Sequence, residues 1–169
     1  MNAKNETAQP EPAWGHKLGF VDIGTKPPVA TSGQLLDRLV ILDLISRYAW
    51  SYDDRLTESL SNMFAADAVF EANIGGGMSV GPHTGGQTIV DWLASLMEGQ
   101  TDQRRHSIAN HVFAAQTDTA ATVTAQMLIT SAAHSATSIV TSGFYVFDFV
   151  KTSGDWRIQR LFAGFDNAF

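Results

Sequence analysis

The order of hydrophobic patterns along the chain constrains its fold more than any other feature. Helical patterns predominate between Thr31 and Met97, and from Arg104 onward apolar residues recur at every second position. The strand-like runs are 104–116, 119–133, 137–151 and 155–166. Their connections, such as Thr117–Asp118, are so short that neighbouring strands must be antiparallel. The sequence therefore predicts an α+β fold, with N-terminal helices packed on a curved, mainly antiparallel sheet.

Three helices are predicted ahead of this sheet. The first begins at Thr31, which has capping-box spacing to Gln34, and ends near Tyr52–Asp54. Its expected buried stripe is Leu35, Leu36, Leu39, Leu42, Ile45 and Ala49. A second helix is expected over 56–64, followed by a strand over 67–74. The same capping spacing at Thr84 predicts the third helix, with a stripe of Ile89, Trp92, Leu93, Leu96 and Met97.

The composition divides the chain into an arm at 1–30 and one domain at 31–169. The first dozen residues are polar and contain proline, which predicts a disordered tail. Later in the arm, apolar side chains such as Trp14 and Phe20 would be costly to leave in water. We therefore expect part of Trp14–Pro28 to pack on the domain or on a neighbouring subunit.

Charge and cysteine content exclude several classes of function. The net charge is -6, so no basic surface is expected to bind nucleic acid. The chain has no cysteine, which excludes disulfides and thiolate metal sites. No apolar stretch is long enough to span a membrane, so we expect no membrane segment and a cytoplasmic location. We expect no metal site, because no HxH or HExxH spacing occurs. The glycine clusters match no phosphate-binding motif and are interpreted as turns.

Asp53 and His106 are the candidate catalytic pair. A carboxylate that accepts from one imidazole nitrogen leaves the other nitrogen free to take a proton. Alternation places His106 on one strand face with Ile108, Asn110 and Val112, and places His111 on the other. Two plainer interpretations remain open: His106 is a buried core residue, or Asp53 belongs to a simple turn after the helix.

The other strands provide walls for a cavity that small molecules could enter, although the same pattern describes an ordinary core. The expected wall includes Val140, Ser142, Phe144, Val146 and Asp148. The opposite face of the same strand, with Tyr145, Phe147 and Phe149, is expected to be exposed and to pair subunits. The sequence thus predicts a homo-oligomer, a dimer or a trimer.

Three local patterns resemble the SnoaL-like branch of the nuclear transport factor 2-like, or cystatin-like, superfamily. They are 41–49 (ILDLISRYA) followed by Asp53, 63–70 (MFAADAVF) and 106–110 (HSIAN). The resemblance covers about residues 33–166 and implies a cone-shaped α+β barrel. In these segments the chain is similar to scytalone dehydratases and hexachlorocyclohexane dehydrochlorinases, in which an acid–imidazole pair removes a proton from carbon.

By this resemblance, Asp53, His106 and Tyr48 are candidate catalytic residues. The residues expected to bind substrate are Tyr52, Phe70, Leu93, Asn110, Val112, Phe144 and Arg160. The resemblance implies a cofactor-independent lyase or isomerase of the dehydratase or polyketide-cyclase type. Its expected substrate is small and largely apolar, and cyclic molecules are among the candidates. The alternative is a module that binds a small molecule or assembles with partners without turnover, as in dioxygenase small subunits.

Overall fold

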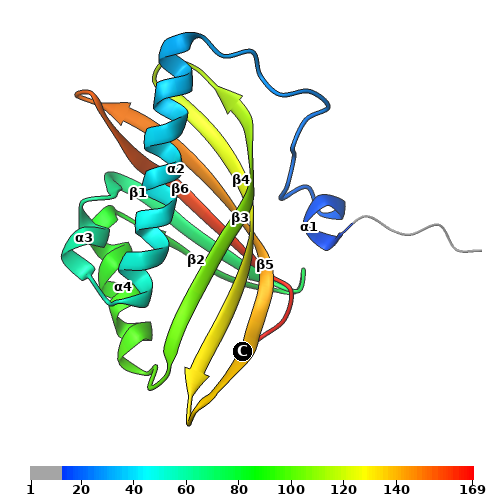
Figure 1. Ribbon diagram of the computed structural model, residues 1–169, viewed down its shortest axis with the longest axis vertical. Coiled ribbons are helices and arrows are strands. Elements are labelled where there is room, and N and C mark those ends of the chain that lie inside the picture. The colour runs from blue at the N-terminus through cyan, green and yellow to red at the C-terminus, as the bar shows by residue number, and fades with distance from the viewer. Residues whose placement is uncertain (1–12) are drawn as a thin grey trace, which may run out of the picture.

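The computed structural model describes residues 13–169, in which three of the helices cover one face of a single curved sheet (Figure 1). The helices are α1 (Trp14–Lys17), α2 (Ser32–Asp53), α3 (Thr57–Ser61) and α4 (Gly86–Glu98). The strands are β1 (Phe64–Ile74), β2 (Met78–Thr84), β3 (Gln103–Gln116), β4 (Ala120–Ala133), β5 (Ala136–Thr152) and β6 (Asp155–Phe165). The predicted α+β architecture is confirmed.

The sheet has the order β2-β1-β6-β5-β4-β3. Strands β3 to β6 form the predicted antiparallel meander, and β1 pairs with β6 in parallel. Strand β2 was not predicted; it forms a hairpin with β1 through the turn at Gly75–Gly77. Because Thr84 still pairs with Val69 in that hairpin, it does not cap α4, and the predicted capping box is wrong there.

Helix α2 begins as predicted, with both hydrogen bonds of the Thr31–Gln34 capping box present. Its predicted stripe is correct at Ile45 and Ala49 but wrong in the N-terminal half. The face turned toward the sheet there is polar, because Arg38 donates to Gln116 and Asp37 accepts from Lys151 and Trp156. The side chains of Leu35, Leu36, Leu39 and Val40 are consequently more than half exposed.

The second predicted helix is shorter than expected. Helix α3 spans Thr57–Ser61, and Phe64 already belongs to β1, where it pairs with Ile158. The pattern predicts that Leu56, Leu60, Met63 and Phe64 are buried; this is correct for the last three, whereas Leu56 is 52% exposed. The last residue of the predicted helix, Phe64, therefore forms strand hydrogen bonds instead of helical ones.

The core lies between the helices and the sheet. Strand β5 contributes Tyr145, Phe147 and Phe149, each no more than 2% exposed. The expectation that these three aromatic residues form an exposed pairing face is wrong. Both faces of β5 are apolar in sequence, so alternation by itself does not identify the face covered by helices.

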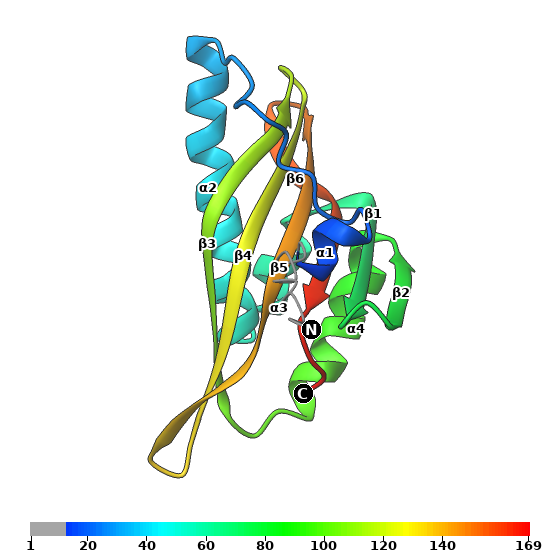
Figure 2. The same ribbon diagram turned by 90° about the vertical axis from the view of Figure 1, so that its right-hand side faces the viewer.

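The N-terminal arm lies on the other face of the sheet, opposite α2, α3 and α4 (Figure 2). The Trp14 indole donates to Asp166 at 2.8 Å and lies 5.1 Å from the Phe144 ring. Phe20 stacks on Phe162 with ring centroids 4.7 Å apart. The expectation that part of Trp14–Pro28 packs on the domain is confirmed. The expected disordered tail, residues 1–12, lies outside the described residues.

Candidate active site

Asp53 and His106 are hydrogen-bonded, although 53 residues separate them. The last residue of α2 is Asp53, and its Oδ1 lies 2.6 Å from the Nδ1 of His106. Its second oxygen, Oδ2, accepts from the backbone N–H of His106 at 2.8 Å. The side chains are only 5% and 6% exposed, respectively. The carboxylate thus orients both the ring and the strand that carries it.

This geometry determines which imidazole nitrogen is available for chemistry. A carboxylate only accepts hydrogen bonds, so the neutral ring of His106 carries its proton on Nδ1 and a lone pair on Nε2. Within residues 13–169, Nε2 has no hydrogen-bond partner. The Tyr52 ring packs edge-on against the imidazole at 4.7 Å. The arrangement is able to accept a proton at Nε2 and to stabilise the resulting imidazolium through Asp53.

His106 lines a cavity of about 550 Å³ between the helices and the sheet. Of the residues expected to contact substrate, Tyr52, Phe70 and Leu93 line it, and so does Tyr48. The other lining residues are Ala72, Ile74, Val80, Trp92, Leu96, Gly99, Gln100, Arg104, Ile129, Tyr145, Phe165 and Phe169. This size and largely apolar wall are typical of small-molecule sites.

Two tyrosines that line the same cavity as His106 keep their hydroxyl protons. Burial raises the pKa of Tyr48 far above its ordinary value, and the neighbouring Tyr52 raises it further. Burial also raises the pKa of Tyr52, whose hydroxyl accepts from the Gln100 side-chain amide at 3.2 Å. Each hydroxyl therefore keeps its proton at neutral pH and is able to donate it in a hydrogen bond.

Asn110 and Val112 do not share the cavity with His106, contrary to the alternation. Ala109 pairs with Gln126 and Val112 with Thr124, so β3 contains one extra residue at this point. The bulge is centred on Asn110, whose φ is 54°, and it reverses the strand faces. Val112 therefore turns outward, whereas Phe113 packs toward the core and under Arg38 of α2.

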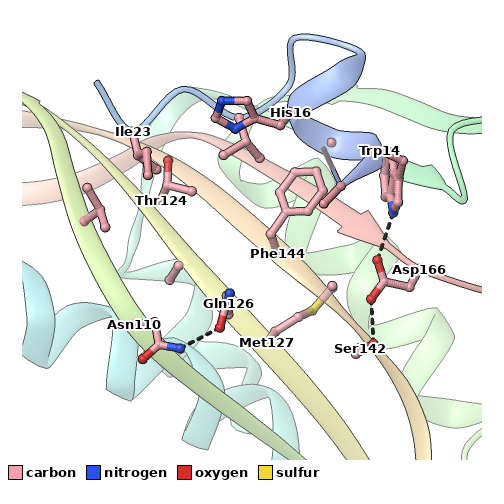
Figure 3. A pocket seen from close by; sticks show the side chains of 16 residues that line it. Trp14, His16, Ile23, Asn110, Thr124, Gln126, Met127, Ser142, Phe144 and Asp166 are labelled. Carbon is pink, nitrogen blue, oxygen red and sulfur yellow. Dashed lines mark hydrogen bonds between the residues drawn. The ribbon is translucent and has the colours of Figure 1, made fainter. Parts of the chain in front are cut away.

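Phe144 and Arg160 also lie on the outer face. Figure 3 shows Phe144 beside Trp14, and Asn110 hydrogen-bonded to Gln126, in an outer pocket of about 560 Å³ under the arm. Arg160 follows a bulge in β6, since Asp148 pairs with Arg160 but Phe149 pairs with Ile158. Its Nε donates to Glu71 at 2.9 Å, away from the cavity. The prediction that these residues line the cavity is wrong.

Sequence reasoning missed Arg104, Gln100 and Trp92 as cavity residues. Arg104 was identifiable, because it lies two positions before His106 and hence on the same strand face. Among residues 13–169, no three His, Asp or Glu side chains are grouped so that they could hold a metal ion. No helix in this part of the chain is long and apolar enough to cross a membrane.

Comparison with known families and structures places this geometry in context. The profile of the SnoaL-like domain matches residues 33–161. A search of curated proteins finds no match. Among solved structures, the beta subunit of a putative aromatic-ring-hydroxylating dioxygenase from Novosphingobium aromaticivorans is similar, with a TM-score of 0.68 and 17% identity over 80% of this chain and 93% of that chain.

Two further structures share the fold. A protein of unknown function with a cystatin-like fold from Nostoc punctiforme has a TM-score of 0.68 and 18% identity, over 84% of this chain and 98% of that one. A Catenulispora acidiphila protein in complex with S-DNPA has a TM-score of 0.67 and 19% identity, over 78% of this chain and 95% of that one. At these identities, the likeness shows the cystatin-like fold.

Proposed function

Because the chain belongs to the SnoaL-like domain family, we propose that it is a cofactor-independent lyase or isomerase of the dehydratase or cyclase type. The observation that carries this proposal is the hydrogen bond between Asp53 and His106, which leaves Nε2 of the imidazole at a largely apolar cavity. A buried base that is oriented by a carboxylate and faces a largely apolar cavity suits proton abstraction from carbon next to a carbonyl.

In the proposed mechanism, His106 takes a proton from the substrate and Asp53 stabilises the imidazolium. The negative charge then develops on a substrate oxygen, to which Tyr48 and Tyr52 donate hydrogen bonds. Phe70 and Leu93 contact the apolar part of the substrate. The proton on His106 afterwards returns to another carbon, or to a leaving hydroxyl, so that the base is regenerated and no cofactor is consumed.

Hydrogen–deuterium exchange tests the proton abstraction before the natural substrate is known. The probe is 2-tetralone in D2O, and the loss of its α-proton signals is followed by 1H NMR. A general base contributes about 100- to 10,000-fold, so His106→Ala should lose most of the exchange that the wild type accelerates. His16→Ala is the control, because His16 lies at the outer pocket. Equal exchange rates for the wild type and His106→Ala would contradict the proposal.

The second candidate function is a binding or assembly module without turnover. The similar dioxygenase beta subunit favours it, as do the exposed apolar residues Leu36 and Leu39 on α2. We also propose that the protein forms a homo-oligomer and is cytoplasmic. Light scattering on the wild type and on Leu36→Glu tests the oligomer, whose mass should fall in the variant if α2 pairs subunits.

A further inference from the structure

Four polar residues of the inner cavity, Tyr52, Gln100, Arg104 and His106, interact with one another in a wall that is otherwise largely apolar. The Gln100 amide donates to the Tyr52 hydroxyl, and the Tyr52 ring packs on the His106 imidazole. Burial raises the pKa of the Tyr52 hydroxyl, and the positive charge of Arg104 acts in the opposite direction and lowers it. A ligand that fills this cavity therefore meets a few hydrogen-bonding groups and a largely apolar wall.

Arg104 contributes a positive charge that is anchored and mostly removed from water. Its Nε donates to the Asp102 carboxylate at 2.7 Å, and the side chains are 18% and 14% exposed. A hydrogen bond from Ser131, together with that from Arg104, holds the pKa of Asp102 below its ordinary value, so the anchor stays ionised. The guanidinium carbon lies 5.7 Å from the centre of the Phe169 ring, which also lines the cavity.

Most donors of this guanidinium have no acceptor. Its two terminal nitrogens carry four N–H groups, and neither nitrogen has a hydrogen-bond partner within residues 13–169. The planar pair of terminal nitrogens matches the geometry of a carboxylate. The neighbouring Arg105 differs: it does not line the cavity, is 47% exposed, and contacts Asp54 and the Trp50 ring.

We propose that Arg104 determines substrate specificity by binding a carboxylate, so that the substrate is a small, largely apolar organic acid. The inference rests on the proposed function, because it places the reacting carbon at Nε2 of His106. Residues two apart on a strand are separated by roughly 7 Å. The carboxylate and the carbon that loses its proton are therefore several bonds apart, and the apolar part of the substrate contacts wall residues such as Phe70, Leu93 and Trp92.

Binding of two matched compounds tests this proposal without turnover. Isothermal titration calorimetry compares 2-naphthoate with 2-naphthamide, which has nearly the same shape but no charge. The wild type should bind the acid at least tenfold more tightly than the amide. Arg104→Gln should remove this preference, Arg104→Lys should keep part of it, and the matched control Arg105→Gln should keep all of it.

Each result bears on the proposal. A wild type that binds the two compounds equally, or binds neither, overturns it even if Arg104→Gln fails to fold. An Arg104→Gln protein that folds and keeps the tenfold preference overturns it as well. Failure of the proposed function is distinguishable, because His106→Ala should keep the preference for the acid whether or not His106 catalyses proton exchange.

Discussion

Replacing Asp53 should change the tautomer of His106 and should destabilise the fold by an amount that depends on the replacement. Asp53 accepts two buried hydrogen bonds, from Nδ1 and from the backbone N–H of His106. In Asp53→Asn, the amide oxygen can still accept from the backbone N–H, but the amide nitrogen then donates to Nδ1. The ring proton must move to Nε2, which can no longer take a proton from a substrate.

The magnitudes follow from the same two bonds. Hydrogen bonds to a charged group contribute about 1.5–3 kcal/mol, and neutral ones about 0.5–1.5 kcal/mol. Asp53→Asn keeps both contacts without the charge and should lower the free energy of unfolding by about 2 kcal/mol. Asp53→Ala leaves the backbone N–H of His106 without an acceptor and should cost about 3–5 kcal/mol.

Two measurements check this prediction. The 15N shifts of the His106 ring at pH 8 identify the protonated nitrogen, and urea unfolding gives the stability. Asp54→Asn is the matched control, because Asp54 is 41% exposed and pairs at 3.4 Å with Arg105. An Asp53→Asn protein that keeps the wild-type tautomer would refute the reasoning, as would an Asp53→Ala protein as stable as the control.

Two other predictions concern the outer face and the pH dependence of stability. In Gly164→Ala, the new methyl would lie 2.3 Å from the Phe144 ring. We expect the arm to loosen at a cost of about 1–3 kcal/mol, seen as faster trypsin cleavage after Lys17 than in the control Gly99→Ala. Burial lowers the pKa of His111 from 6.5, so the unfolded chain takes up a proton there more readily than the folded protein does. The contribution of neutral His111 to stability is complete above pH 6.5 and is lost as the pH falls from there through the lowered pKa. His111→Phe should therefore lose less stability than the wild type between pH 7.5 and 5.5 in urea unfolding, and an equal loss in the two proteins would contradict this account.

Local patterns in the sequence were sufficient for the fold class, for helices α2 and α4 and for the meander, but not for β2. The Thr31–Gln34 capping box and the two-residue period after Arg104 predicted α2 and the meander. The resemblance in the segments around Asp53 and His106 indicated that these two residues lie together. The capping box and the two-residue period are carried by residues close in sequence, where backbone geometry alone relates side chains to one another. The pairing of Asp53 with His106, 53 residues apart, was indicated only by the resemblance.

Only the tertiary structure decided which side chains share a cavity. One extra residue at Asn110 and another in β6 reverse the strand faces, so that Val112 and Arg160 turn outward while His106 stays inside. The apolar pattern of β5 is similar on both faces, so it does not identify the inner face. Phe144 lies outside because α2 packs on the opposite face of the sheet and the arm packs on Phe144. A period of two is a local property, whereas its starting phase at each strand depends on bulges and on which face the helices cover.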